Sequence, residues 1–478
     1  MARSSSPKYD CCEREPNARA AVKVKRVTGA YGVGNSRSRE GAEKVGKHKS
    51  ITTHADPSNS LPLAGVRVLE IGQVIAGPFC GQLLGQFGAE VIKVEPPYIG
   101  DPLRVWRELD VDGVSPWWRS IGRNKKSVTI DLRKEDGRKL VKALAIKSDV
   151  LIENFKPGTL EKWQLGPDDL HPLNPTLIFT RVSGYGQTGP WSSRPGYASV
   201  CEAESGFRYI NGFSHPETGT LFGPPVRPNM SLGDSVAGLH AAFGTVLALL
   251  ARRNQQVKGS PSGQVVDVSI FESMINLMEG IIPDYDRKGE IRGPSGSSVT
   301  GIVPTNAYPC LPAGESPETP VYVVIGANAD SMYTRMMIAI GREDLTGPLY
   351  ARNQNRVERQ QEIEDAISTW TKTRSIEEVQ EVMQGAGVPC GRVVSVKEII
   401  ENPHAKARGL FEDVWVGDKQ DGWSVKMSRS APVLHGYDTT TRWAGPDLGQ
   451  HNKEVLVGEL GLGEAEYEEY IRQGIVGV

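Results

Sequence analysis

Val66-Arg-Val-Leu-Glu-Ile71 opens the part of this chain that decides its fold, and Val91-Ile-Lys-Val94 continues it. Both runs are short and rich in β-branched residues, which favour extended strands. The segment Gly81–Gly88 between them is compatible with a helix. A strand, a helix and a second strand in this order predict a βαβ unit, whose two strands pair in parallel.

The same alternation continues along the chain. Further strands are expected at Val128–Leu132, Val150–Ile152, Leu177–Val182 and Gln264–Ile270, and helices at Lys134–Lys147, Ser235–Asn254 and Phe271–Gly280. After a loop-rich stretch, 287–320, we expect a strand at Val321–Ile325 and helices at Ser331–Ile340, Arg356–Thr371 and Ile376–Gln384. The pattern predicts an α/β protein with an open, mostly parallel sheet and a smaller α+β domain after it.

The composition is that of a globular protein, and its 478 residues are enough for more than one domain. The longest apolar run, Ala237–Ala251, is shorter than the roughly 18 residues of a membrane span and contains His240 and Gly244. No membrane association is therefore expected. Six cysteines without a C-x-x-C pair are typical of a reducing compartment rather than of a disulfide scaffold.

Residues 1–60 differ from the rest of the chain in charge. They carry 12 Lys and Arg against 6 Asp and Glu, a net charge of +6, which leaves −8 on residues 61–478. Without apolar periodicity, this basic stretch is expected to be a disordered N-terminal extension. The cluster Lys23–Arg26 is compatible with mitochondrial targeting, whereas Asp10 and Glu13 count against it, and a cytoplasmic protein is the alternative. The acidic body argues against a nucleic-acid partner.

Gly184-Tyr-Gly186-Gln-Thr-Gly189 follows a strand and matches the dinucleotide-binding pattern G-x-G-x-x-G. That pattern needs a helix directly after it, but Pro190 and Pro195 follow here, so a glycine-rich turn is the better interpretation. The chain has no H-E-x-x-H, no G-x-S-x-G and no His/Cys/Asp cluster with metal-ligand spacing. We therefore expect neither a metal site nor a serine-hydrolase mechanism.

Asp234 is the strongest candidate for a catalytic residue in this sequence. It lies between the turn-rich Gly223-Pro-Pro-Val-Arg-Pro228 and an apolar helix, so the simplest interpretation is a helix N-cap. The same position allows a chemical role, because helix amides and the helix dipole hold a carboxylate in its ionised form. An ionised carboxylate can act as a nucleophile, and Gly233 would let a substrate approach the backbone closely.

A series of short motifs runs from about Pro62 to Val478. The first are Leu69-Glu-Ile-Gly-Gln-Val74-Ile-Ala76-Gly-Pro78, Gly100-Asp101, Asn124-Lys-Lys-Ser127 and Glu153-Asn154-Phe155-Lys-Pro157-Gly158. Further motifs are Ser183-Gly-Tyr-Gly186, Leu232-Gly-Asp234, Gly263-Gln-Val-Val-Asp267, Gly387-Val-Pro-Cys-Gly391 and Leu448-Gly-Gln-His451. In this order and at this spacing, the chain resembles the class III CoA-transferases of the CaiB/BaiF, or formyl-CoA transferase, type.

The resemblance implies a Rossmann-like large domain, a small α+β domain and an interlocked homodimer whose two chains are threaded like links. On this basis residues 61–290 form the first part of the CoA-binding large domain, and 291–372 form the small domain. Residues 373–478 then return to the large domain, and 1–60 remain as the extension. The strand and helix pattern agrees with the two domains, but it could not have revealed the interlocking.

The resemblance also implies that Asp234 is the nucleophile. In the family this aspartate attacks the thioester of a donor acyl-CoA, giving a mixed anhydride, and the CoA thiolate then forms an aspartyl-CoA thioester. An acceptor acid takes CoA from there through a second anhydride. Water must be excluded, because anhydrides hydrolyse. A glycine-rich lid of the family corresponds here to 293–301, with Gly296 and Gly301 as substrate contacts; an ordinary connector is the alternative.

CoA, the co-substrate, is expected to contact residues at which the family's motifs match. They are Val74 and Ala76 along the pantetheine path, Ile130, Leu132 and Arg133 near the adenine and 3′-phosphate, and Asn154, Phe155, Lys162 and Tyr197. Lys162 stands where the family often has arginine and suits a phosphate, with a solvated surface charge as the alternative. The chain departs from the formyl enzyme at Ile75, which replaces a polar residue, and at Pro96, which replaces an arginine that grips the nucleotide.

Two other functions compete with CoA transfer. The α-methylacyl-CoA racemases share the fold but need a histidine in a Gly-His-Asp motif, where this chain has Gly196-Tyr197-Ala198. A non-catalytic CoA-binding protein is the second alternative, and it predicts that Asp234→Asn changes no activity.

The acceptor and donor are suggested by one stretch only. Residues Ser295–Pro309 are similar to transferases that act on succinyl-CoA and small dicarboxylic acids. A second carboxylate on the acceptor would need a cation, for which Arg104 and Arg227 are candidates, with a structural role as the alternative for either. We therefore expect succinyl-CoA as the donor and a small dicarboxylate or related acid as the acceptor.

Overall fold

The computed structural model describes residues 60–312, 321–418 and 420–478. The N-terminal extension, predicted over residues 1–60, falls outside the described residues except for Ser60. The targeting interpretation that rests on it lies outside them too. The description therefore begins just before the first expected strand.

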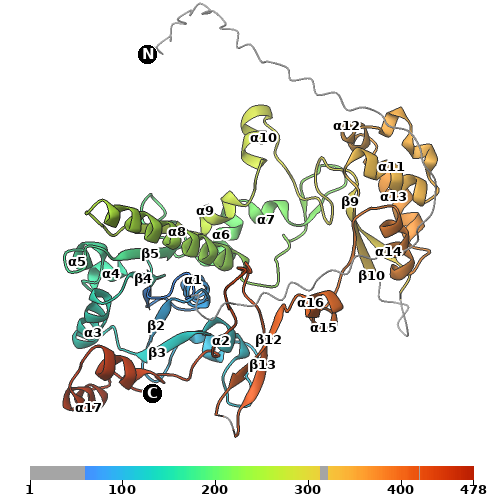
Figure 1. Ribbon diagram of the computed structural model, residues 1–478. Helices are drawn as coiled ribbons and strands as arrows, with labels where there is room; N and C mark the ends of the chain where they lie inside the picture. The colour runs from blue at the N-terminus through green and yellow to red at the C-terminus, as the bar shows by residue number, and fades with distance from the viewer. Residues whose placement is uncertain (1–59, 313–320, 419) are drawn as a thin grey trace, which may run out of the picture. The chain divides into compact units, whose positions relative to one another are not determined.

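A six-stranded sheet forms the centre of the large domain. Its strands are β1 (Arg67–Glu70), β2 (Glu90–Glu95), β3 (Lys125–Thr129), β4 (Val150–Glu153), β5 (Ile178–Ser183) and β8 (Val265–Ser269). Their order is β3-β2-β1-β4-β5-β8, and every neighbouring pair is parallel (Figure 1). The expected open parallel sheet is confirmed. The order reverses between β1 and β4, and such sheets bind ligands outside the carboxyl ends of the strands at this point.

Helices cover both faces of the sheet, because successive residues of a strand point to opposite faces and both sets are apolar. Val68 and Ile152 face α1 and α8, whereas Leu69 and Leu151 face α3, α4 and α5. The last helix of the chain, α17, packs on this second face as well (Figure 1). The bounds are α1 (Ala76–Gln86), α3 (Glu135–Ile146), α4 (Thr159–Lys162), α5 (Pro167–Leu170), α8 (Leu232–Val257) and α17 (Glu464–Arg472).

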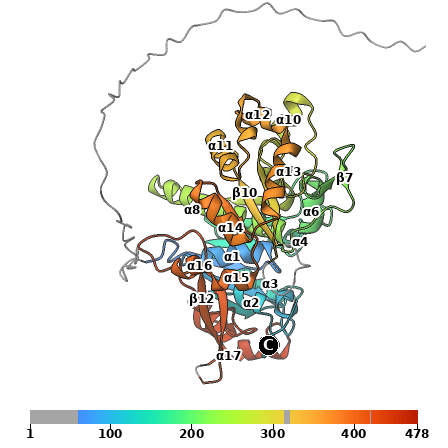
Figure 2. The ribbon, with the colours of Figure 1, turned by 90° about the vertical axis from the view of Figure 1, so that its right-hand side faces the viewer.

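The small domain has an antiparallel sheet in the order β11-β10-β9. Its strands are β9 (Thr305–Cys310), β10 (Val321–Gly326) and β11 (Cys390–Arg392), and its helices are α11 (Asp330–Ala339), α12 (Asn353–Val357), α13 (Gln360–Thr371) and α14 (Ile376–Gly385). These helices gather around β10 (Figure 2). The stretch 287–320, which was expected to be rich in loops, thus contains the strand β9. Its Pro309 is tolerated because β9 is the edge strand of the sheet.

The predicted boundary at 372 between the small domain and the return segment is wrong. Ile376, Val379 and Met383 of α14 belong to the same buried cluster as Val323 of β10, so the small domain continues as far as β11. Packing, rather than the position of a loop, sets this boundary.

The chain does return to the large domain further on. The indole of Trp443 donates to the Lys125 carbonyl at 2.9 Å. The Asn452 side chain makes two hydrogen bonds with Thr129, of 2.7 and 2.8 Å. The C-terminal segment therefore runs along β3, the edge strand of the main sheet, and protects that edge.

Several shorter elements connect these parts. They are α2 (Pro116–Ile121), α6 (Ala198–Glu204), α7 (Phe207–Ile210), α9 (Ile270–Asn276), α10 (Ile281–Lys288), α15 (Val396–Glu401), α16 (Pro403–Ala407), and the hairpins β6 (Phe213–Ser214) with β7 (Leu221–Phe222) and β12 (Phe411–Val416) with β13 (Trp423–Ser428). The hairpin of β12 and β13 was not expected from the sequence. The stretch Gly184–Gly189 is a turn with no helix after it, as predicted.

One helix in the described residues, α8, is long and apolar enough to cross a membrane by length and composition. Its inner side packs against α1, α9 and the strands β5 and β8 of the main sheet. These contacts are those of a helix that covers the face of a sheet.

Candidate active site

Asp234 lies in the first turn of α8, which begins at Leu232. The N-cap residue is Ser231, so the interpretation of Asp234 as the N-cap is wrong: it is the third residue of the helix. It remains close to the positive end of the helix dipole, because that effect extends over the first turn.

Gly233, before the nucleophile candidate, is buried where three helices meet. A Cβ at this position would lie 3.0 Å from Cγ2 of Ile270, at the start of α9, and 3.3 Å from Cβ of Ala198 on α6. Both distances are shorter than an ordinary van der Waals contact, so any side chain would push the first turn of α8 from its neighbours. The structure thus gives Gly233 a packing role, where the sequence suggested substrate approach.

The charge of Asp234 is opposed by its surroundings. Burial, and next the negative charge of Glu202, raise the pKa of Asp234 to about 6, while Arg227 acts in the opposite direction. The sequence predicted that the helix terminus would hold this carboxylate ionised; it did not foresee that burial raises the pKa. A carboxyl group with this pKa is still mostly ionised at neutral pH, and it is a stronger base than an ordinary aspartate.

The helix of Asp234 packs directly against the start of α1. One turn after Asp234, a Cβ on Gly238 would lie only 2.7 Å from the Ala76 carbonyl oxygen. The two backbones can approach this closely only because the residue is glycine. Ala76 and the loop before it are therefore held beside the first turns of α8.

The loop of Gln73 and Val74 is fixed from two sides. The Asn154 amide accepts from the Gln73 N–H and donates to its carbonyl, both at 2.8 Å. Val74 has a left-handed backbone, φ 68°, and its N–H donates to the Asp101 carboxylate at 3.1 Å. A β-branched residue adopts this conformation only where its surroundings hold it. Val74, Ala76 and Asn154, three of the predicted CoA contacts, thus belong to one rigid loop region.

A buried cluster of charges lies under this loop. Lys93 lies 2.9 Å from Asp101 and 3.2 Å from Glu70, and Lys125 lies 2.8 Å from Glu70. Burial lowers the pKa of Lys93, but Asp101 and Glu70 outweigh it and raise that pKa above its usual value. Lys125 also donates to the Pro78 carbonyl at 2.7 Å, so the cluster ties β1, β2 and β3 to α1. We call Glu70, Lys93, Asp101 and Lys125 the buried charge cluster.

Two cavities open beside this region and share Phe155. The first, of about 260 Å³, lies at the carboxyl ends of β1, β2, β3 and β4, where the fold predicts a ligand. The second, of about 240 Å³, continues past Asn154 to the turn before α6. Between them they bring together six of the predicted CoA contacts, namely Ile130, Leu132, Arg133, Asn154, Phe155 and Tyr197.

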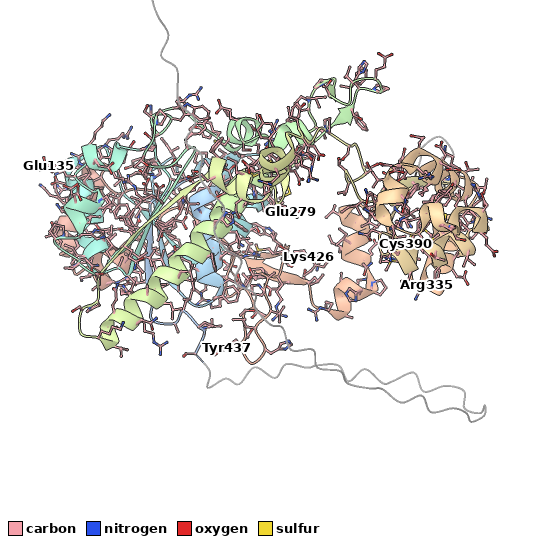
Figure 3. The ribbon with its side chains drawn as sticks, turned by 90° about the horizontal axis from the view of Figure 1, so that it is seen from above. Glu135, Glu279, Arg335, Cys390, Lys426 and Tyr437 are labelled. Carbon is pink, nitrogen blue, oxygen red and sulfur yellow. The ribbon has the colours of Figure 1, made fainter. Side chains whose placement is uncertain are left out.

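Lys162 lies in a separate cleft of about 560 Å³ between α3 and α4. Arg138, Lys139 and Lys142 of α3 line it together with Glu135, which is labelled in Figure 3. This cleft adjoins the first cavity, because Trp163 lines both and Arg138 donates to the carbonyls of Leu132 and Arg133. A cleft lined by basic side chains therefore continues the cavity in which the predicted CoA contacts gather.

Arg104 does not have the free charge that its predicted substrate role requires. It is buried, its Nε and Nη2 each donate to Glu95 at 2.8 Å, and its guanidinium stacks on Trp118. The prediction that Arg104 binds the acceptor is therefore wrong, because its charge is already neutralised. Arg227, the other candidate, is exposed and acts on Asp234.

Gly296 and Gly301 lie in the connector to the small domain. Gly296 donates to the Gly212 carbonyl at 2.9 Å, beside the hairpin of β6 and β7. The Gly301 carbonyl accepts from the Asn353 side chain at 2.8 Å. Both glycines have positive φ, 64° and 77°, so they serve turns in this connector. Their described contacts do not include Asp234, and their role towards substrate stays a prediction.

Two groups near the site were not singled out from the sequence. Asp101 was quoted only as part of a motif, although an Asp in a Gly-Asp-Pro turn after a strand is a signal that its side chain holds a backbone amide. Glu202 had no signal at all, because only the fold brings α6 against α8. Within the described residues, no group of three His, Cys, Asp or Glu side chains is arranged to hold a metal ion.

A family model for CoA-transferase family III matches residues 63–452. The chain belongs to CoA-transferase family III. It is therefore an enzyme that moves CoA between acids, and the resemblance seen in the sequence is confirmed. CoA is the co-substrate of this family.

Two curated relatives cover most of this CoA-transferase. The succinyl-CoA–D-citramalate CoA-transferase of Chloroflexus aurantiacus is 45% identical over 404 residues, which are 84% of this chain and 95% of the relative. The human succinyl-CoA:glutarate CoA-transferase is 30% identical over 425 residues, 88% of this chain and 91% of the relative.

The fold of this CoA-transferase also matches solved structures. A crystal structure of a CAIB/BAIF family protein from Brucella suis superimposes with a TM-score of 0.70 at 28% identity. The match covers 84% of this chain and all of that one. The α/β fold with a Rossmann-like sheet is thus shared along the length of both proteins.

Proposed function

We propose that this CoA-transferase takes CoA from succinyl-CoA and passes it to a small dicarboxylic acid, with Asp234 as the covalent carrier. The observation that carries the proposal is the half-buried Asp234 carboxylate, with a raised pKa, at the end of a helix that packs on the CoA-lining loop. The two relatives named above both use succinyl-CoA, and both names include a dicarboxylic acid.

The reaction proceeds in two half-reactions. A carboxylate oxygen of Asp234 attacks the donor thioester, and CoA leaves as its thiolate from a mixed anhydride. The thiolate then attacks Cγ of Asp234, releases the donor acid and leaves an aspartyl-CoA thioester. The acceptor acid repeats both steps in reverse. Splitting the exchange in this way keeps every step between species of similar energy.

CoA binds with its nucleotide in the first cavity and its pantetheine along Phe155, Asn154 and the Val74 loop towards Asp234. The apolar Ile130 and Leu132 suit the adenine, and Arg133 suits a phosphate. The 3′-phosphate lies towards the cleft between α3 and α4, where Lys162 and Arg138 supply positive charge. The positive charge of Lys162 and Arg138 thus takes the place of the arginine that the formyl enzyme has at the position of Pro96.

Arg227 holds the second carboxylate of the acceptor. It is exposed, it lies in the segment that leads into α8, and its charge already acts on Asp234. A dicarboxylate with one end at Asp234 would reach a cation in this segment with the other end. We further propose that the connector 293–301 closes over the site to exclude water.

The enzyme works as a homodimer. α8 exposes a stripe of large apolar side chains, with Leu239, Phe243 and Leu247 between 48% and 62% exposed. At spacings of four residues these side chains lie on one face of the helix. An exposed apolar stripe of this kind marks a surface that a partner covers, and a second copy of this chain is the proposed partner. The proposed partners are thus the two substrates and a second copy of the chain, and neither a membrane nor a nucleic acid is among them.

The decisive experiment is an assay of CoA transfer from succinyl-CoA to a panel of acids, with acetate and oxalate as controls. Transfer to at least one small dicarboxylate supports the proposal. If no dicarboxylate is turned over, the substrate assignment falls while the family assignment stands. Borohydride or hydroxylamine trapping during turnover, followed by peptide mass spectrometry, tests separately whether the covalent group sits on Asp234.

An epimerase of the racemase type is the competing activity. It would exchange the α-proton of an acyl-CoA with solvent in the absence of any acceptor. The position of the racemase histidine is occupied by Tyr197, so the Gly-His-Asp motif of the racemases is not present there. Deuterium uptake at the α-carbon without an acceptor acid would favour the epimerase.

The N-terminal extension directs the enzyme to mitochondria; retention in the cytoplasm is the alternative outcome. The basic charge of residues 1–60 supports this proposal. Fusion of residues 1–60 to a fluorescent reporter, with the same reporter alone as control, distinguishes the two.

A further inference from the structure

Glu202 on α6 is a completely buried carboxylate that the reaction described above does not use. Its Oε2 pairs with the Arg208 guanidinium at 2.8 Å, and its Oε1 accepts a hydrogen bond of 3.1 Å from the Gly233 amide. Gly233 directly precedes Asp234. Glu202 therefore holds the backbone of the first turn of α8 at the residue next to the nucleophile.

The Gly233 amide belongs to the first turn of α8, whose N–H groups have no acceptor inside the helix. Such amides usually turn towards a carboxylate of the first turn and stabilise its charge. Here the Glu202 carboxylate accepts the hydrogen bond of the Gly233 amide, so this amide does not donate to Asp234. The same contact that fixes the turn also removes a source of stabilisation for the free carboxylate of Asp234.

Few charged groups act on Asp234 in the described part of the chain. They are Glu202 from α6 and Arg227 from the segment before α8, and the thiol of Cys201, next to Glu202 in the sequence, is a further titratable group that interacts with Asp234. Burial raises the pKa of Cys201 to about 11, so this thiol stays neutral at the pH of the reaction. Arg208 is held by Glu202 itself. The balance at the nucleophile is therefore set by one buried anion and one exposed cation.

We propose that Glu202 is a positioning residue for the nucleophile, which fixes the first turn of α8 through the Gly233 amide and places a negative charge beside Asp234. The proposal rests on the covalent role of Asp234 proposed above. Glu202 itself touches no substrate.

The charge of Glu202 favours the acylated enzyme. When an Asp234 oxygen attacks the thioester carbonyl, a C–O bond forms, the C–S bond breaks, and the electron pair leaves on the CoA sulfur. When the thiolate attacks Cγ, a C–S bond forms and the pair leaves with the donor carboxylate. Asp234 is neutral in both products. A nearby anion destabilises only its free carboxylate. It therefore shifts the first equilibrium, and with it the overall balance between the free enzyme and the aspartyl-CoA thioester, towards the covalent intermediates.

The test is Glu202→Gln, which keeps an oxygen for the Gly233 amide and removes the charge. We expect the acidic limb of the pH profile of kcat/KM for succinyl-CoA to move down by about one pH unit. The aspartyl-CoA thioester formed from succinyl-CoA alone, measured by intact-protein mass spectrometry, should fall about tenfold, because one pKa unit is a factor of ten.

Two further variants make the result specific. Arg227→Gln removes the opposing cation and should move the same limb to higher pH. Glu204→Gln, on the same helix but not among the groups that act on Asp234, should leave the limb where it is. If Glu202→Gln alone does not fold, Glu202→Gln with Arg208→Met removes both charges of the pair and should show the same downward shift.

An unchanged acidic limb and an unchanged amount of thioester in folded Glu202→Gln would overturn the proposal and leave Glu202 as a packing residue. The failure of the covalent mechanism has a different signature. In that case Asp234→Asn would still form a CoA thioester on the enzyme, whatever Glu202→Gln does.

Discussion

Two groups of buried carboxylates lie in the large domain, and they are arranged in opposite ways. In the buried charge cluster, Glu70 and Asp101 each face a lysine within 3.2 Å, so opposite charges compensate one another. At the start of α8, Asp234 has the negative charge of a second carboxylate beside it, that of Glu202, which is itself paired with Arg208 at 2.8 Å. Among the described residues, the exposed Arg227 is the cation that acts on Asp234.

The difference separates a structural role from a chemical one. A compensated buried cluster holds a backbone in place and gains nothing from changing its charge. A second carboxylate nearby destabilises the ionised form of a carboxylate. This repulsion is lost when the group becomes a neutral anhydride or thioester. The first arrangement suits the loop beside the proposed CoA site, and the second suits the residue that is proposed to be acylated.

The largest effect is expected at the nucleophile. Asp234→Asn should lower the turnover number by about 10⁴-fold or more, because removing a nucleophile typically costs this much. Steady-state CoA transfer at pH 7.5 measures it. Wild-type turnover in the folded variant would show that Asp234 is not the carrier.

Removing a charge from the buried charge cluster should lower the free energy of unfolding. Lys93→Met leaves Asp101 buried without its cation, and breaking a buried pair in this way costs about 3–5 kcal/mol. Urea unfolding followed by circular dichroism gives the free energy of unfolding. Exposed Lys139→Met, whose ion pairs lie in solvent, is the control and should change it by less than about 1 kcal/mol. Equal losses in the two variants would contradict the view that the cluster fixes the loop.

Asp234→Asn should change stability in the opposite direction. The pKa of Asp234 in the folded protein, about 6, lies above its ordinary unfolded value, so ionisation costs folding free energy at higher pH. At pH 8 the variant should be more stable than the wild type by about 1–3 kcal/mol. The difference should disappear as the pH falls below about 4, where both forms are neutral. A destabilised variant at pH 8 would show that the Asp234 charge is compensated after all.

The rate should follow the ionisation of Asp234. Its free carboxylate is the reactive form, so kcat/KM for succinyl-CoA should be flat above about pH 7 and fall about tenfold per unit below its pKa of about 6. A limb near pH 4, the ordinary value of an aspartate, would argue that neither burial nor Glu202 acts on the nucleophile in solution.

The smallest effect is expected at the edge of the CoA site. Lys162→Ala should raise KM for succinyl-CoA about fivefold, about 1 kcal/mol, and leave kcat unchanged, because an exposed charge contributes little. The effect should be lost with a donor that lacks the 3′-phosphate. Lys147→Ala, an exposed lysine after the last turn of α3 that lines neither the α3–α4 cleft nor the two cavities, is the matched control.

The order of the elements could be predicted because it rests on local signals. Alternating β-branched runs such as Val66–Ile71 and Val150–Ile152 indicate buried strands whatever their partners are. The boundaries could be predicted less well. The end of the small domain depends on whether α14 packs with β10, which is a contact between residues far apart in the sequence. The strand β9 carries Pro309, which local rules assign to a loop.

The same division holds for the site. The sequence by itself determined the family, and it marked Asp234 and the cavity residues as candidates for the nucleophile and the CoA contacts, because these assignments depend on residue types in a fixed order. The tertiary structure alone decided that Arg104 is neutralised by Glu95, and that Asp234 shares a buried environment with Glu202. These depend on which charges meet across space, and the strength of a charge interaction is set by distance and burial, which a linear sequence does not contain.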